Sequence, residues 1–589
     1  VRIGCYSAFW GDSTAAAVQL VQHEGENLDY LVADYLAEIT MGILAARRQR
    51  RLMTGKLDKG TDYIAEFLTL VLSKILPDLI KNGTKVVTNA GGLDPIGCKE
   101  AIEALLEELN IQGVTVAAVV GDDLLKSNEE GGYRHTSLAT MTTTFNNQIH
   151  SFSPISTVDH TKEADRLPSK DEPILSVNAY LGSHAIAAAL KEGAHIVVTG
   201  RVVDSALVVG PLMYEYGWEE GKTADYYDLL ASASLSGHII ECGCQATGGN
   251  FTDWHLVAQS PYGGYSNMGY PIIEFDRSGS FIVTKPVKTG GLVSPATVAE
   301  QLVYEILDPA LYLLPDVILD MRQVTLSQVG HNRVLVKGAK GLQPTPYLKC
   351  SGIFLDGWKL TGELLIGGVD ARKKAIAVGE AILQRVRNMY QELGIQDFRN
   401  VNIEPIGAES LYGPYSATSH TREVVLRLTA HHDDPKALGL VALETIPSAT
   451  CMAPGITGGG SGRPKAVPNM VHFPLLISKT QITTSYTVGP HGKLKSIDWG
   501  SWDGNETYSQ PRPIPPPSPN NDDEPSSSSL DEEGKQNKRG TQLINVAYGR
   551  SGDKGDVCNI GIIARDPAYW PYIKRSITEE VVANYMKHL

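Results

Sequence analysis

The stretch Lys85-Val-Val-Thr-Asn-Ala-Gly-Gly-Leu-Asp94 decides the fold class of this chain. Its first four residues include two valines and a threonine, and they predict a short strand. The polar, glycine-containing residues after them predict a loop at the carboxyl end of that strand. A helical pattern over Gly97–Leu109 follows at once. A strand, a polar loop and a helix in this order form the unit from which parallel α/β sheets are built.

The same unit recurs through the first 210 residues. Near-continuous apolar strands alternate there with helical segments such as Tyr63–Lys81, which predicts a mostly parallel sheet flanked by helices. The predicted strands are Val1–Tyr6, Leu28–Ala33, Lys85–Thr88, Thr115–Val120 and His195–Thr199. Residues 270–350 and 420–490 differ, because they carry alternating apolar and polar residues between glycine and proline turns. They predict a second, α+β region, interrupted by a helix at Asp370–Leu393.

Composition sets the predicted domain boundaries. Residues 505–540 are rich in proline and contain an acidic patch and four consecutive serines, so they cannot bury enough apolar surface to offset chain entropy. We therefore predict an α/β domain over residues 1–265, an α+β domain over 266–504, a disordered linker over 505–540 and a small α+β C-terminal domain over 541–589.

The overall composition excludes several classes of protein. The chain has 589 residues and a formal net charge of −14, so it lacks the basic surface that nucleic acids need and suits anionic membranes poorly. It has no apolar run of about 18 residues and no visible signal peptide. Its seven cysteines are dispersed, as in reduced proteins. We expect a cytoplasmic protein that binds neither nucleic acid nor membrane, and a homo-oligomer on general grounds.

Polar or small residues follow each of the five predicted strands. Ligands of parallel α/β sheets bind outside the carboxyl ends of the strands, so these residues are expected to share one site. Asp12, Ser13 and Asp34, after the first two strands, fit helix N-caps as well as a site. The candidates after the other strands are Asn89, Gly91, Gly92 and Asp94, then Asp122 and Asp123, and finally Arg201 and Asp204.

Each candidate has a chemical role and a structural alternative. The planar guanidinium of Arg201 suits a carboxylate or phosphate, although Arg201 and Asp204 could simply form an ion pair three residues apart. Asp122 and Asp123 fit a general acid/base or a Mg²⁺ site, or else a solvated turn. Gly91 and Gly92 could let a ligand approach the backbone, or only permit a turn.

Residues 237–255 form the segment with the most functional side chains. Its candidate site residues are Glu241, Cys242, Gln245, Asn250 and Asp253. A zinc site is disfavoured because Cys-x-Cys is not the usual structural spacing. A nucleophilic Cys242 or Cys244 would need a base such as His238 or His255. We favour the interpretation that this segment is a polar loop that closes over the strand-end site. We assign no metal site and no required cofactor, although the sequence is compatible with the binding of a divalent metal.

Long segments of the chain resemble the acyclic terpene utilisation (AtuA) family. The resemblance covers most of residues 1–490 and rests on LDYLVADYLAEITMGILA, VVTNAGGLDPIGC, VVTGRVVDSALVVGPL, ECGCQATGGNFTDW and TKPVKTGGLVSPATVAEQLVYEI. The tail, with VAYGRSGDKGDVCNIGIIAR, resembles the small AtuA-like C-terminal domain and implies a partial copy of it. Within the tail, Gly549–Asp556 is predicted as a turn between strand-like segments. The resemblance implies a pathway context of branched acids and acyl-CoA intermediates and no assigned reaction.

Three functions are compatible with these observations. The first is a lyase or hydratase in which Arg201 binds a carboxylate or acyl-CoA and Asp122, Asp123 or Asp204 moves a proton. The second is a hydrolase or transferase with Cys242 or Cys244 as the nucleophile. The third is a non-catalytic partner subunit of an acyl-CoA-processing complex, with the tail as its interaction module.

Overall fold

The structure is a computed structural model, and it divides the chain into two compact units. The first contains residues 1–353 and 472–569, and the second contains residues 354–471 and 570–589. The described residues are 1–54, 62–125, 141, 149–151, 168, 172–418, 420–458, 462–497, 541–554 and 557–589. The predicted disordered linker over 505–540 lies outside them.

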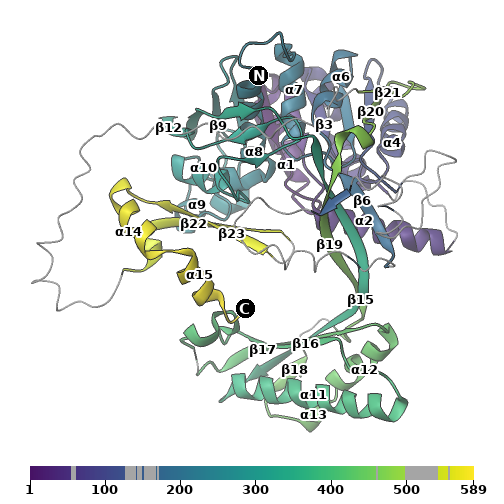
Figure 1. Cartoon of the computed structure of the whole chain (residues 1–589), viewed down its shortest axis with the longest axis vertical. Coiled ribbons are helices and arrows are strands. Elements are labelled where there is room, and N and C mark those ends of the chain that lie inside the picture. Colours follow the sequence, from purple (N-terminus) through teal and green to yellow (C-terminus); the bar gives the residue numbers. More distant parts are fainter. Residues whose placement is uncertain are drawn as a thin grey trace, which may run out of the picture. The chain divides into compact units, whose positions relative to one another are not determined.

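The first unit is built on a mixed sheet of 11 strands, in the order β12-β13-β9-β8-β1-β2-β3-β7-β4-β20-β21 (Figure 1). Its five central strands are parallel, and they confirm the predicted α/β class. They are β1 (Arg2–Cys5), β2 (Tyr30–Ala33), β3 (Lys85–Thr88), β7 (Ile196–Thr199) and β4 (Val116–Val120). Strand β7 lies between β3 and β4, so Val198 pairs with both Thr88 and Ala118.

Antiparallel strands extend this sheet at both edges. On one side, β8 (Ile272–Phe275) pairs with β1, and β9, β13 and β12 follow outward. On the other side, β20 pairs with β4 and β21 with β20. The outer strands are β9 (Phe281–Thr284), β13 (Arg333–Lys337), β12 (Thr325–Gly330), β20 (Ser485–Val488) and β21 (Lys495–Ser496). The period-2 segments near residues 272–284 therefore continue the first sheet.

Helices cover both faces of the central strands. Leu31 and Ala33 of β2 face a core that includes residues of α1 (Ala15–Glu24), α3 (Ser73–Asn82) and α4 (Pro95–Glu108). The alternate residue Tyr30 faces the other way, and its hydroxyl donates a hydrogen bond of 2.6 Å to Glu215 of α7. This second face is covered by α6 (His184–Lys191), α7 (Ala206–Tyr216) and α8 (Tyr226–Glu241), which pack in succession.

The second unit contains an antiparallel sheet covered by helices. Its strands β16 (Asn400–Ile406) and β17 (Glu423–His432) pair with each other, and β17 also pairs with the long strand β15 (Tyr347–Gly367). Helices α11 (Ala371–Leu393) and α12 (Pro435–Thr445) share a buried core with these strands. This agrees with the predicted α+β character of the region.

The tail contains a hairpin, β22 (Ala547–Lys554) and β23 (Val557–Ala564), followed by α14 (Trp570–Ser576) and α15 (Glu579–Met586). The predicted turn at Gly549–Asp556 is wrong for its first six residues, because they continue β22 as far as Lys554. In the first unit the hairpin lies beside α10 (Pro295–Leu302; Figure 1). Within the described residues, none of the helices has the length and apolarity that a bilayer crossing needs.

Candidate functional site

Four polar residues follow four of the central strands directly or after one intervening residue, and hydrogen bonds join them in two pairs. The amide of Asn89, after β3, donates a hydrogen bond of 2.6 Å to the carboxylate of Asp34, after β2. The backbone N–H of Arg201, after β7, donates one of 2.9 Å to Asp122, after β4. All four are buried. The carboxyl ends of these parallel strands therefore carry a buried polar cluster.

Asn89 has a fixed orientation in this cluster. Its side-chain oxygen accepts a hydrogen bond of 2.7 Å from the N–H of Tyr35, while its NH₂ group donates to Asp34. The carboxylate of Asp34 also accepts one of 3.0 Å from the N–H of Leu36. Asn89 thus fixes the chain that leaves β2 and orients the Asp34 carboxylate.

Arg201 is the positive charge of the cluster and is only 2% exposed. One of its terminal nitrogens donates to the carbonyl oxygen of Val202, at 3.1 Å, and to the carboxylate of Asp204. Its guanidinium lies 4.1 Å from the centre of the Tyr180 ring, a cation–π contact. Among the described residues, its Nε has no hydrogen-bond partner. A buried cation therefore retains one donor without a hydrogen-bond partner.

Carboxyl groups outnumber the positive charge around Arg201. Burial raises the pKa of Asp34 well above its ordinary value, and nearby Asp204 adds to the shift while Arg201 opposes it. Burial likewise raises the pKa of Glu241 to about 7, with Asp204 contributing in the same direction. Carboxyl groups that exchange a proton near neutral pH are suited to general acid–base catalysis. Asp204 is 28% exposed, so the cluster reaches solvent there.

Glu241 is the last residue of α8 and pairs with His238, one turn earlier. Nδ1 of His238 lies 3.2 Å from the Glu241 carboxylate, and its Nε2 lies 3.2 Å from the carbonyl oxygen of Leu302 at the end of α10. Burial opposes the charged imidazole, but the hydrogen bond with Glu241 and the negative charges of Glu241 and Glu305 together outweigh it and raise the pKa of His238. The pair can therefore hold a proton at neutral pH.

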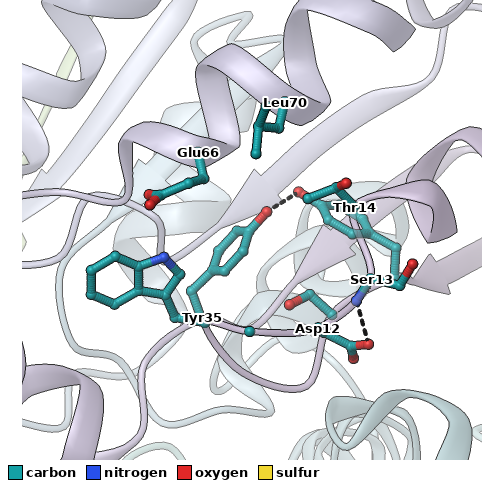
Figure 2. Close-up of a pocket in the computed structure, with 10 residues that line it drawn as sticks. Asp12, Ser13, Thr14, Tyr35, Glu66 and Leu70 are labelled. Atoms are coloured by element: carbon teal, nitrogen blue, oxygen red, sulfur yellow. Dashed lines mark hydrogen bonds between the residues drawn. The ribbon is translucent and has the colours of Figure 1, made fainter. Parts of the chain in front are cut away.

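A cavity of about 140 Å³ opens at the carboxyl ends of β1 and β2 (Figure 2). Its wall combines aromatic, apolar and polar side chains. The lining residues are Tyr6, Ser7, Trp10, Gly11, Asp12, Ser13, Thr14, Tyr35, Glu66 and Leu70. The hydroxyls of Tyr6 and Tyr35 are hydrogen-bonded at 2.8 Å. Asp12 accepts hydrogen bonds from the N–H groups of Ala8, at 3.0 Å, and Ser13, at 2.7 Å, so it organises the loop after β1.

The cavity adjoins the buried cluster through Ser7. Its hydroxyl donates to the backbone oxygen of Asp34 at 3.0 Å, and the N–H of Asp34 donates to the oxygen of Ser7 at 3.0 Å. Ser7 and Tyr35 both line the cavity, and Tyr35 is the next residue after Asp34. One backbone segment therefore forms the cavity wall on one side and carries the Asp34 carboxylate.

Several predicted site residues have structural partners. Asp123 forms a buried ion pair of 2.9 Å with Arg48. Asp122 accepts a hydrogen bond of 2.8 Å from Asn178 besides that from Arg201, and burial raises its pKa to about 7. Asp94 caps α4 by accepting a hydrogen bond of 3.1 Å from Gly97. These residues hold the strand ends in place.

Gly91 and Gly92 are packed against protein atoms. A Cβ at Gly91 would meet the backbone oxygen of Thr199 at 2.5 Å, and one at Gly92 would meet that of Asp62 at 2.7 Å. Gly92 also has a positive φ of 55°, which favours glycine. Gly91 permits close packing against β7 and Gly92 against the backbone at Asp62, so their predicted approach to a ligand gains no support from these contacts.

The loop after Glu241 faces the C-terminal hairpin. Gln245 accepts a hydrogen bond from Arg550, and Asp253 accepts two of 2.6 Å from Arg565. Asn250 is exposed and adopts a positive φ of 59°. Gln245 and Asp253, which the sequence suggests as ligand-binding residues, thus bind another part of the chain.

The thiols of this loop are not activated. Burial and the charge of Glu241 raise the pKa of Cys242 well above its ordinary value, and burial raises the pKa of Cys244 to about 12. A nucleophilic cysteine needs a lowered pKa, so these surroundings disfavour the cysteine mechanism. Within the described residues, no three His, Cys, Asp or Glu side chains are placed to hold a metal ion.

One member of the cluster, Asp34, also fits a helix N-cap when the sequence is considered alone. Asp34 directly follows β2, as Asn89 directly follows β3, and this shared position is the pattern that identifies it. Tyr180 similarly follows β6 (Ile174–Ala179) and contacts Arg201, but an isolated tyrosine at a strand end carries no comparable pattern.

Family models match most of the chain. Residues 1–488 match the model of the family described as acyclic terpene utilisation family protein AtuA, and residues 541–589 match an AtuA ferredoxin-like domain. No curated protein and no solved structure matches the chain.

Proposed function

We propose that this chain, which belongs to the acyclic terpene utilisation (AtuA) family, is a lyase- or hydratase-like enzyme acting on a branched carboxylic acid or acyl-CoA. One observation carries this proposal. Arg201 is buried with an unpaired Nε and interacts electrostatically with Asp34 and Asp204. These two carboxyl groups interact in turn with Glu241, which has a pKa of about 7. A cation and proton-exchanging carboxyl groups are what such a reaction requires.

In this proposal, Arg201 binds the carboxylate or the thioester carbonyl oxygen of the substrate. Its Nε would donate to that oxygen and stabilise the negative charge that develops there during the reaction. The branched apolar chain would occupy the cavity beside Trp10, Tyr35 and Leu70, which supply aromatic and apolar wall. The exposed part of Asp204 marks the side from which the ligand would reach Arg201.

The proton chemistry balances with water as the only co-reactant. In the hydration direction, a carboxylate removes a proton from water, and the water oxygen bonds to the β-carbon of an α,β-unsaturated acyl group. The electron pair of the double bond moves to the α-carbon and carbonyl, and a protonated carboxyl group delivers a proton to the α-carbon. We assign the protonated carboxyl to Glu241 and the base to Asp204.

Turnover of a substrate panel tests the proposal. The full chain is incubated with straight and branched 2-enoyl-CoA and 3-hydroxyacyl-CoA thioesters, and addition or loss of water is followed by mass spectrometry. We expect turnover of branched members, with a decrease of about 10²- to 10⁴-fold in Glu241→Gln. Glu392→Gln, an exposed change on α11, serves as the matched control.

Two results would count against the proposed function. One is the absence of turnover with every panel member by a folded chain. The other is turnover in Glu241→Gln equal to that of the wild type and of the Glu392→Gln control. The first result would favour the non-catalytic partner subunit, because that function needs no acid–base chemistry at the strand ends.

A further inference from the structure

The C-terminal hairpin contacts the loop that follows Glu241. Arg550 of β22 is 8% exposed, donates to Gln245 and lies over the ring of Tyr304, with 4.6 Å between the guanidinium carbon and the ring centre. The N–H of Gly549 donates to the hydroxyl of Thr252 at 3.1 Å. These contacts tie β22 to a loop separated from it by about 300 residues of sequence.

A second set of contacts fixes the far part of the same loop. Arg565 binds both carboxylate oxygens of Asp253 at 2.6 Å and lies over the ring of Tyr548, at 4.2 Å. The Tyr548 ring also stacks on Phe251, with ring centres 5.6 Å apart. The hydrogen bonds from Arg565 lower the pKa of Asp253, so the pair is charged at neutral pH. Planar two-point pairing holds the loop in one orientation.

The hairpin also binds the chain at the end of α10, which contacts the ring of His238. The side-chain amide of Asn559, on β23, donates to the carbonyl oxygens of Val303, at 3.3 Å, and Ile306, at 3.2 Å. These carbonyls follow the end of α10, where the carbonyl oxygen of Leu302 contacts His238. The hairpin therefore contacts both the loop that follows Glu241 and the chain just after Leu302, whose carbonyl oxygen contacts His238.

We propose that the hairpin β22–β23 is a positioning element for Glu241, with Arg550 and Asn559 as its positioning residues. The proposal rests on the proposed function, in which Glu241 donates the proton. A further contact links the hairpin to the surroundings of Glu241. A Cβ at Gly552 would meet Glu305 at 2.7 Å, so β22 packs directly on Glu305. Glu305 in turn interacts electrostatically with both Glu241 and Cys242.

The reactivity of Cys242 reports on this arrangement without any need for turnover. Cys242 adjoins Glu241, and its thiol is held in an unreactive state by its surroundings. The full-length chain is treated with iodoacetamide, and alkylation at each cysteine is followed by mass spectrometry. The variants are Arg550→Met and Asn559→Leu. Cys558→Ala, an exposed position on β23, is the control variant, and the exposed Cys451 is the reference thiol.

We expect Cys242 to react at least about tenfold faster in Arg550→Met and Asn559→Leu than in the wild type, with Cys451 unchanged. Arg550→Lys should restore part of the protection. With an active substrate, the Glu241 limb of the pH–rate profile should also move to lower pH, because water would reach the carboxyl group.

An unchanged Cys242 rate in both variants would overturn the proposal. If the melting temperature shows that one of these variants is not folded, Thr252→Val takes its place, because this change removes only the hydroxyl contact with Gly549. An unchanged Cys242 rate in Thr252→Val would likewise overturn the proposal. Absence of turnover in the wild type would contradict the proposed enzyme, whereas the alkylation rates decide the role of the hairpin separately.

Discussion

The side-chain amide of Asn89 donates a hydrogen bond of 2.6 Å to the carboxylate of Asp34, so the ends of two neighbouring parallel strands share one buried polar pair. This pair adjoins the cavity through Ser7, whose hydroxyl donates to the backbone oxygen of Asp34, and Asp34 interacts electrostatically with Arg201. The relationship connects the architecture of the sheet to the chemistry of the site, because the strand order brings residues 55 positions apart into contact.

Replacement of Asn89 by alanine should destabilise the first unit. The change leaves the N–H of Tyr35 and the carboxylate of Asp34 without their buried partner, and each loss of this kind costs about 1–3 kcal/mol. Chemical denaturation of the variant should therefore show a lower free energy of unfolding. Asn388→Ala, at an exposed position of α11, is the control and should stay within about 0.5 kcal/mol of the wild type. Equal stabilities of the two variants would contradict the role assigned to Asn89.

Asp122 should make stability depend on pH. Burial raises its pKa from 3.8 to about 7 in the folded chain, so the folded state retains a proton that the unfolded state has lost. Its contribution to stability is therefore present below about pH 4 and is lost as the pH rises through about 7. Denaturation at pH 5 and pH 8 should show that Asp122→Asn gains stability relative to the wild type at the higher pH. A difference between the two proteins that is independent of pH would exclude this behaviour.

Replacement of Leu70 by tryptophan should obstruct the cavity. Leu70 lines it and is 42% exposed, so the larger side chain can enter the cavity without disturbing a packed core. If the apolar chain of the ligand binds there, affinity for a branched acyl ligand should fall by about tenfold or more while the melting temperature changes little. Leu411→Trp, at an exposed position of the second unit, is the matched control. Unaltered affinity in Leu70→Trp would mean that the ligand does not use this cavity.

The central strands could be predicted from the sequence because their apolar, largely β-branched runs are local features. Lys85–Thr88 is found as predicted, and Ile196–Thr199 differs by one residue. The position of β7 between β3 and β4 could not be predicted, since strand order depends on packing between distant segments.

Only part of the candidate site could be predicted from the sequence. Asn89, Asp122 and Arg201 were identified from their positions after strands, and the structure groups them at one edge of the sheet. The partners of Gln245 and Asp253 were not accessible from the sequence, because they lie on a hairpin about 300 residues away. The proton-holding character of Glu241 also depends on burial and on His238, which only the three-dimensional structure supplies.

Calorimetric titration with 3-methylbut-2-enoate and its CoA thioester tests the central claim most directly, because the proposed site depends on Arg201 as the group that binds the acyl oxygen. We expect at least one of the two ligands to bind the wild-type chain and to bind Arg201→Lys at least about tenfold more weakly, since a lysine cannot reproduce the planar donor geometry. Arg427→Lys, a change in a half-exposed ion pair of the second unit, should leave the affinity unaltered. Equal affinities of the wild type and Arg201→Lys, or no binding of either ligand by the wild type, would contradict the account.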